Sequence, residues 1–408
     1  MKIALLHYSV PPIVGGVESV IGHQARLMAD DGYEVCMIAG RGGQTDHRVG
    51  FVQLPMADSR HPVVVSLKAQ LDRGTIPEEF FDRVAELSEA LKEAISGTDC
   101  LIAHNVCSLN KNLILTAALK KVSEELPSLR TILWHHDLAW TTPRYRHELH
   151  EGYPWDLLRT AWPGVEHVTI SHFRQKELAF LMNIPEEGVW VIPNGVDLAR
   201  FLKLDTLTSR LVERLDLLNA CPILLLPVRI TPRKNIELAL QILARMRDET
   251  PRASLIITGP LGPHNAANVE YFEKLQSLRT SLSLEANAFF LAELVTEYLP
   301  DEVVSDFYKL ADALLLPSHE EGFGIPLLEA GLAGLPVYCA DIPPLRDLGL
   351  NYVNYFSPDG QASDIASMIL EQLSSSPLVG FRTHVRSRYA WREIYRKHIE
   401  ILIRKGER

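Results

Sequence analysis

Two glutamates, Glu321 and Glu329, flank a glycine-containing turn in the segment 317–330. A short apolar run of strand length, residues 312–316, precedes this segment, and helix-compatible residues continue to about position 335. A strand, a loop and a helix start in this order leave backbone N–H groups that, with the helix dipole, bind phosphate. Carboxylates are poor phosphate ligands, so we expect the two glutamates to accept hydrogen bonds from hydroxyl groups.

The glycines of this turn, Gly322 and Gly324, have no Cβ atom and therefore let a ligand approach the backbone. A molecule with a diphosphate in the middle and hydroxyl-rich groups at both ends would satisfy the whole segment. A nucleotide sugar has this chemistry. The alternative is a strand-to-helix turn with two solvated glutamates, which the spacing of the glutamates alone does not exclude.

A second strand–loop–helix pattern opens the chain. Residues 2–8 are typical of a buried parallel strand, and Gly15 and Gly16 precede a helical pattern over about 17–30. The loop is not G-x-G-x-x-G, so the dinucleotide-binding fingerprint is absent. This absence argues against a dinucleotide-dependent oxidoreductase.

Two cations follow another apolar strand, residues 222–228. In parallel α/β sheets, ligands bind at the carboxyl ends of the strands, so we expect Arg229 and Lys234 to face a bound phosphate. The alternative is a pair of solvated cations near a turn.

Histidines follow two further predicted strands, as His104 and as the run His135-His136-Asp137. The strand ends place them near a ligand. For each histidine the alternative is burial with its hydrogen bonds satisfied in the core. A metal site built from the four residues is a third interpretation, although the helical spacing of common metal motifs is missing.

The segment 138–159 is rich in arginine and aromatic residues. Arginine suits phosphate or carboxylate, and aromatic faces suit sugar rings. We expect Arg144, Tyr145 and Arg146, together with His104, to bind a second substrate, the acceptor. The alternative is a lid packed on its own domain.

Length and composition indicate a two-domain globular protein. The chain has 408 residues, 47% of them hydrophobic, and a net charge of −10, which excludes general nucleic-acid affinity. No apolar run reaches the length of a transmembrane helix, and the scattered cysteines lack metal-site spacing, so we expect a cytoplasmic protein. Basic residues dominate the segment 382–408. We expect a solvated helix face or an interdomain contact there, and the alternative is a contact with anionic lipid at a membrane surface or with an acceptor phosphate.

Apolar runs alternate with helical patterns, which predicts an α/β fold with parallel sheets. We expect strands near 34–39, 49–54, 100–103, 131–134, 167–170, 254–259, 289–291 and 337–340. Domain 1 is expected to cover 1–197 together with a last helix at 391–408. Domain 2 is expected to cover 198–390.

The string E-G-F-G-I-P-L-L-E-A at 321–330, followed by G-L-P-V at 334–337, resembles the signature of retaining, nucleotide-sugar-dependent glycosyltransferases of the GT-B superfamily, family 4. The resemblance extends from Gly15-Gly16 through Asn194-Gly195 to Trp391. It implies two Rossmann-like domains facing each other across a deep cleft, with the C-terminal helix crossing back to domain 1. The turn at 259–268 and Ala292-Glu293 depart from the family pattern.

The resemblance also implies roles. Glu321 would hold the transferred hexose, Glu329 the ribose, and the two cations the diphosphate. His136, with His135 as the competing choice, would orient the sugar. The residues expected to bind the donor are Gly16, Arg229, Lys234, Phe323, Gly324, Ile325 and Glu329.

Family members retain the anomeric configuration by same-face attack, in which the leaving phosphate takes the acceptor proton, so no protein nucleophile is expected. The chain contains no Asp-x-Asp pair, which predicts metal-independent transfer without a cofactor. The donor would be a UDP-, GDP- or ADP-sugar, and the acceptor a sugar, a phosphorylated metabolite or a lipid. The alternatives are a nucleotide-sugar epimerase of the same form and a non-catalytic nucleotide-sugar-binding protein.

Overall fold

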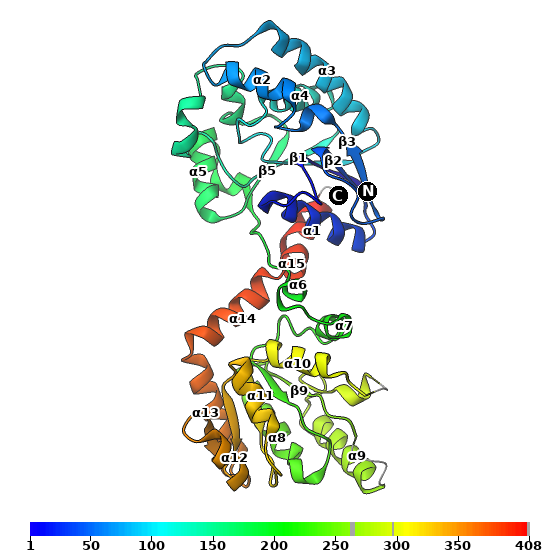
Figure 1. Cartoon of the computed structure of the whole chain (residues 1–408), viewed down its shortest axis with the longest axis vertical. Helices are drawn as coiled ribbons and strands as arrows, with labels where there is room; N and C mark the ends of the chain where they lie inside the picture. Colours follow the sequence, from blue (N-terminus) through cyan, green and yellow to red (C-terminus); the bar gives the residue numbers. More distant parts are fainter. Residues whose placement is uncertain (262–265, 296–297, 406–408) are drawn as a thin grey trace. The chain divides into compact units, whose positions relative to one another are not determined.

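The computed structural model describes residues 1–261, 266–295 and 298–405, and the chain forms two compact units (Figure 1). Unit 1 contains Met1–Gly195 together with the segment that begins at Ile394, and unit 2 contains Val196–Glu393. Each unit is built around one parallel sheet. The predicted α/β class with two Rossmann-like sheets is confirmed. Most of the turn at 259–268, residues 262–265, lies outside the described residues.

Unit 1 has a seven-stranded sheet in the order β3-β2-β1-β4-β5-β6-β7, with every neighbouring pair parallel. Along the chain, β2 and β3 are added at one edge of β1, and β4 to β7 are then added at its other edge. This reversal puts the carboxyl ends of β1 and β4 next to each other. The strands are β1 (Lys2–Ser9), β2 (Glu34–Arg41), β3 (Val49–Gln53), β4 (Cys100–His104), β5 (Arg130–His135), β6 (Val165–Thr169) and β7 (Val189–Val191).

Among the helices of unit 1, α3 (Glu78–Ala94) buries one apolar stripe. In α3, Phe80, Val84, Leu87 and Leu91 recur at helical spacing and are buried, whereas charged residues occupy the exposed face. The α-helices are α1 (Gly16–Asp30), α2 (Pro62–Leu71), α3 (Glu78–Ala94), α4 (Leu113–Glu125) and α5 (His172–Met182). Short 3₁₀ turns are η1 (Pro55–Ala57), η2 (Pro143–Glu148), η3 (Trp155–Leu158) and η4 (Glu186–Gly188).

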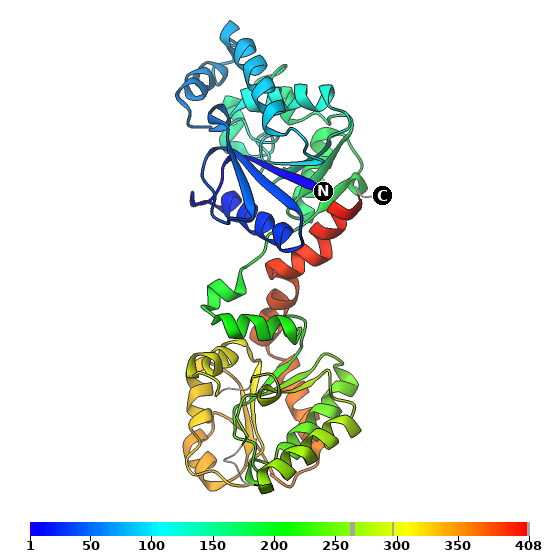
Figure 2. The ribbon, with the colours of Figure 1, turned by 90° about the vertical axis from the view of Figure 1, so that its right-hand side faces the viewer.

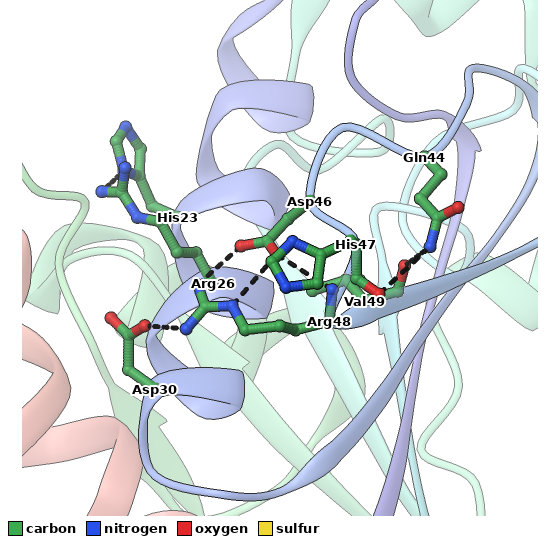
Figure 3. A network of polar contacts seen from close by, with 8 residues as sticks. All are labelled: His23, Arg26, Asp30, Gln44, Asp46, His47, Arg48 and Val49. Carbon is green, nitrogen blue, oxygen red and sulfur yellow. Dashed lines mark hydrogen bonds and ion pairs between the residues drawn. The ribbon is translucent and has the colours of Figure 1, made fainter.

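Residues 42–48 connect two parallel strands, β2 and β3, without a helix, and polar contacts fasten this connection (Figure 3). The Arg48 guanidinium donates to the carboxylates of Asp46 and of Asp30, the last residue of α1, both at 2.6 Å. The Gln44 amide donates to the carbonyl oxygen of Val49 at 3.0 Å. The edge strand β3 is thereby tied to α1.

The C-terminal segment completes unit 1. It begins at Ile394, the last residue of α15 (Trp391–Ile394), and continues through the π-helical η7 (Tyr395–Ile399) and α16 (Glu400–Arg404). Ile399, Leu402 and Ile403 are fully buried. The Arg130 guanidinium, at the start of β5, donates to the carbonyl oxygens of Leu402 and Ile403 at 2.8 and 3.0 Å. These carbonyls belong to the last helical turn, where no backbone partner remains.

Unit 2 has a six-stranded parallel sheet in the order β10-β9-β8-β11-β12-β13. Figure 2 shows this unit from a second side. Strand addition reverses between β8 and β11. Leucine and isoleucine dominate the central strands, which are buried along their whole length. The strands are β8 (Ile223–Leu226), β9 (Ser254–Ile257), β10 (Ala288–Phe290), β11 (Ala313–Leu316), β12 (Val337–Ala340) and β13 (Asn354–Phe356).

A buried ion pair fixes the last helix of unit 2 to its sheet. Arg386 donates to both carboxylate oxygens of Asp312, at 3.0 and 2.8 Å, and to two backbone carbonyls. The helices and turns are α6 (Leu198–Leu202), α7 (Thr206–Arg214), η5 (Pro232–Lys234), α8 (Ile236–Glu249), α9 (Ala266–Ser281), η6 (Leu291–Glu293), α10 (Asp301–Leu310), α11 (Ile325–Ala333), α12 (Pro343–Gly349), α13 (Ala362–Ser374) and α14 (Pro377–Tyr389). Within the described ranges, no helix is both long and apolar enough to cross a bilayer.

Candidate functional site

In unit 2 the candidate site lies where strand addition reverses. The carboxyl ends of β8 and β11 are neighbours there, and ligands of parallel α/β sheets bind at such a position. Lys234 follows β8 and Glu321 follows β11. Their side chains meet with 2.6 Å between Nζ and Oε1, and they are only 9% and 7% exposed. The hydroxyl of Ser318 donates to the same carboxylate oxygen at 2.8 Å.

Backbone and amide hydrogen bonds hold the two loops together. The N–H groups of His319 and Glu320 donate to the carbonyl oxygen of Arg233 at 2.9 and 3.4 Å. Asn235, in the left-handed conformation at φ 51°, donates its side-chain amide to the carbonyl oxygens of Pro317 and Pro358. These bonds therefore hold the loop that carries Lys234 and the loop that carries Glu321 in place relative to each other.

The N-terminus of α11 (Ile325–Ala333) has backbone N–H groups that can bind an anion. Within the part of the chain that the structure describes, the backbone N–H groups of Phe323, Gly324 and Ile325 donate no hydrogen bond. Pro326 occupies the first turn and has no N–H. Gly324 adopts φ +106°, and a Cβ atom there would lie 2.7 Å from the side chain of Leu345. Only glycine fits this close, left-handed turn.

Glu329 lies on α11 beside α10. The hydroxyl of Tyr308 donates to its Oε2 at 2.6 Å. Burial of Tyr308 and this carboxylate raise the pKa of the phenol well above its usual range. Both residues line a surface pocket of about 580 Å³, together with Lys309 and Ser305.

The other predicted cation, Arg229, is exposed. The sequence treats Arg229 and Lys234 as one pair of phosphate ligands. In the structure Lys234 is buried against Glu321, whereas Arg229 is exposed.

In unit 1 three histidines meet where strand addition reverses, at the carboxyl ends of β1 and β4 and just after β5. Nδ1 of His7 donates to the carbonyl oxygen of His104 at 2.7 Å, and Nδ1 of His104 lies 3.2 Å from Nε2 of His136. Asn105 accepts hydrogen bonds from the backbone N–H groups of His136 and Asp137. His104 is fully buried, which argues against the direct acceptor contact that the sequence predicts.

The adjacent His135 has a different partner. Its Nε2 lies 3.0 Å from Nδ1 of His167, and the two rings stack. Burial lowers the pKa of His136 to about 3 and that of His7 and His167 to about 4. All three are therefore neutral at pH 7. Among the described residues, no three His, Cys, Asp or Glu side chains are arranged to hold a metal ion.

The predicted acceptor segment forms η2 and stays accessible. Arg144 and Arg146 are exposed, and the Arg144 guanidinium lies 4.7 Å from the centre of the Tyr145 ring. At the end of η2, Glu148 accepts hydrogen bonds from Lys68 at 2.9 Å and from Asn110 at 2.7 Å. These bonds hold the segment on unit 1.

Gly16 is the first residue of α1, and a Cβ atom there would have no neighbour within 4 Å. A Cβ on Gly15 would collide with the carboxylate of Glu18, which accepts a hydrogen bond from Ser9 at 2.7 Å. The open position of the two is thus Gly16.

Two family models match this chain in succession. The model described as Glycosyltransferase Family 4 matches residues 14–200, and the model described as Glycosyl transferases group 1 matches residues 216–389. The chain belongs to the family 4 (group 1) glycosyltransferases. The predicted family and the enzyme class are confirmed, and each unit has the parallel sheet that the fold class requires.

Similar proteins carry transferase and synthase names. The glycosyltransferase is 25% identical over 382 residues to a mannosylglucosylglycerate synthase of Thermotoga maritima, across 87% of this chain and 84% of the relative. The corresponding protein of Petrotoga mobilis is 25% identical across 85% of both chains. A D-inositol 3-phosphate glycosyltransferase of Geodermatophilus obscurus is 30% identical across 49% of this chain and 44% of its own.

Sequence reasoning missed several polar partners in the glycosyltransferase. Ser318 lies inside the glutamate segment, so its proximity to Glu321 could have been noticed. Tyr308 lies 21 residues before Glu329 on another helix, and no local sequence pattern predicts the contact between them. His7 lies near the end of the apolar strand β1. A polar residue at that position, shortly before the glycine loop, could have marked it as a candidate.

Proposed function

We propose that this glycosyltransferase moves a hexose from a nucleoside diphosphate sugar to an acceptor hydroxyl, with retention and without a metal ion. The observation that carries the proposal is the Lys234–Glu321 pair beside the open N-terminus of α11. An anion site and a hydroxyl-binding carboxylate stand next to each other there, as the two ends of a sugar–phosphate bond require.

In this proposal the diphosphate binds at the start of α11. The N–H groups of Phe323, Gly324 and Ile325 donate to its oxygens, and Lys234 and Arg229 supply positive charge. As the sugar–oxygen bond breaks, negative charge grows on the leaving phosphate. Fixed donors stabilise that charge without reorganising, which lowers the barrier.

The two glutamates take the hydroxyl groups. Oε1 of Glu321 already accepts from Lys234 and Ser318, so its other oxygen serves a hydroxyl of the hexose. Tyr308 orients Glu329, whose remaining oxygen serves the ribose. The base is uridine, guanosine or adenosine.

The transfer itself needs no protein nucleophile. The acceptor oxygen bonds to the anomeric carbon on the face that the phosphate leaves, and the acceptor proton passes to the departing phosphate oxygen. Neutral His136 orients the sugar by a hydrogen bond.

The acceptor that we favour is a small anionic sugar or polyol derivative. The exposed Arg144 and Arg146 suit a carboxylate or phosphate, and the neighbouring Tyr145 suits a sugar ring. The relatives named for mannosylglucosylglycerate and for inositol 3-phosphate point to the same chemistry. A lipid phosphate is the alternative that the test must include.

The test is release of nucleoside diphosphate from UDP-, GDP- and ADP-sugars in excess EDTA, with pooled acceptors. We expect one donor and one pool to give release that falls roughly tenfold or more in Glu321→Gln. Glu320→Gln, an exposed neighbour, serves as the matched control and should leave the rate unchanged.

Each part of the proposal can fail separately. Activity lost in EDTA and restored by Mg²⁺ would overturn metal independence, and an inverted anomer in the product would overturn retention. Conversion of the donor without any acceptor would instead identify a nucleotide-sugar epimerase.

A further inference from the structure

The contact between His104 and His136 raises the question of which ring carries the shared hydrogen. The two nitrogens, Nδ1 of His104 and Nε2 of His136, are 3.2 Å apart. Burial lowers the pKa of both rings well below the usual value, so each ring holds one proton at neutral pH. One ring therefore donates and the other accepts.

The second ring nitrogen of His104, Nε2, decides which of the two rings donates the hydrogen bond. This nitrogen is buried and has no hydrogen-bond partner in the described part of the chain. If His136 were the donor, His104 would carry its own proton on Nε2, as a buried N–H without an acceptor. Buried N–H groups without partners are rarer than under-satisfied acceptors. The favoured arrangement thus has Nδ1–H of His104 donating to Nε2 of His136.

We propose that His104 is a positioning residue that fixes the tautomer of His136, so that His136 carries its proton on Nδ1 and offers it to a hydroxyl of the bound sugar. Nδ1 of His136 makes no hydrogen bond to the described residues. The inference rests on the proposed role of His136 in holding the donor sugar, and it assigns to His104 a function behind that residue.

Three further contacts keep this arrangement in place. Nδ1 of His7 donates to the carbonyl oxygen of His104, which holds the end of β4. The ring of Trp134 stacks on the ring of His104, with 5.3 Å between the centroids. The amide oxygen of Asn105 accepts from the backbone N–H of His136. These contacts hold the ring of His104 on one face, and they hold the backbone of His104 and of His136.

The test reads the tautomer directly. The full chain is labelled with ¹⁵N-histidine, long-range ¹H–¹⁵N spectra are recorded, and the His136 signals are assigned by their loss in His136→Gln. We expect a protonated Nδ1 and an unprotonated Nε2 in His136. Two variants of similar volume separate donation from packing. His104→Asn keeps an N–H donor at the position of Nδ1, whereas His104→Leu has none.

We expect His104→Asn to keep the Nδ1–H tautomer and most of the activity. In His104→Leu, His136 should exchange between tautomers, and kcat/KM for the donor sugar should fall roughly two- to tenfold. A structural role alone would reduce activity equally in both variants and leave the tautomer unchanged.

A wild-type spectrum with the proton of His136 on Nε2 would overturn the inference, and so would an unchanged tautomer in His104→Leu. If His104→Leu does not fold, the wild-type spectrum and His104→Asn still decide. The spectra need no turnover. A chain that shows the expected tautomer but no sugar transfer would therefore refute the proposed function and not the role of His104.

Discussion

Nζ of Lys234 lies 2.6 Å from Oε1 of Glu321, although 87 residues separate them in the chain. The cation and the carboxylate of the proposed donor site thus neutralise each other, in a position where each side chain is less than a tenth exposed. Removing such charges from water costs about as much as their attraction returns. The pair is therefore a weak source of stability, but the loss of one member leaves the other charge buried and alone.

Lys234→Met should lower the free energy of unfolding of unit 2 by about 3–5 kcal/mol, because Glu321 would remain buried without its cation. The double variant Lys234→Met/Glu321→Leu should recover much of this loss. Calorimetry on the single and double variants measures the coupling. Lys274→Met, which breaks the exposed pair of Lys274 with Glu270, should leave the free energy of unfolding nearly unchanged. Equal losses at both sites would contradict the argument.

Tyr308→Phe should weaken donor binding while the fold is kept. The variant removes only the hydroxyl that orients Glu329, so we expect the dissociation constant for the nucleotide sugar to rise roughly two- to tenfold. Titration calorimetry with the donor measures it. The control is Tyr355→Phe, whose hydroxyl donates to the carbonyl oxygen of Leu345. If both variants bind equally well, Glu329 does not need Tyr308.

Gly324→Ala should harm both stability and donor affinity. The new methyl group would meet Leu345 at 2.7 Å, on a backbone at φ +106° that L-residues rarely adopt, at a cost of about 1–3 kcal/mol. Relief of this strain would move the N–H groups at the start of α11. Gly322→Ala is the matched control in the same loop, because nothing lies within 4 Å of its Cβ position. Thermal unfolding of both variants and donor titration of Gly324→Ala test this, and similar losses of stability in the two variants would refute it.

Acid should destabilise unit 1 before unit 2. Unfolding exposes His7 and His167, whose pKa values then return from about 4 to 6.5. Between these pH values the unfolded chain binds more protons, so stability is lost as the pH falls, by up to about 3 kcal/mol for each histidine. In unit 2, His319 and His384 are exposed and not buried. Hydrogen exchange at pH 7 and near pH 5 should show loss of protection confined to unit 1, and uniform loss would contradict the prediction.

The sequence predicted the central strands of both sheets because each is a continuous apolar run. It did not predict α2, where three consecutive valines at 63–65 are typical of a strand, and only Pro62 marks a helix start. The edge strands β7 and β13 are three residues long, too short for any periodicity to appear. Their strand geometry comes from pairing with a neighbour that is distant in the sequence.

The candidate site, like the fold, could be predicted from the sequence only in part. Glu321, Lys234 and His136 could be identified because each follows an apolar strand, and strand ends meet at one edge of a parallel sheet. The direction of a side chain at that edge depends on loops from other strands. For this reason the sequence expected Lys234 to point at a phosphate and His104 at an acceptor. The structure pairs Lys234 with Glu321 and places His104 behind His136.

The C-terminal segment has a consequence for how the chain is made. Ile399 and Leu402 belong to the core of unit 1, yet they follow all of unit 2 in the sequence. A ribosome therefore finishes unit 2 before it reaches the last piece of unit 1. During synthesis unit 2 can close as a contiguous stretch, whereas unit 1 waits with an open apolar surface and with Arg130 lacking its carbonyl partners. The first unit to emerge is the last to be completed, and in the nascent chain it is the one that chaperones and proteases encounter unfinished.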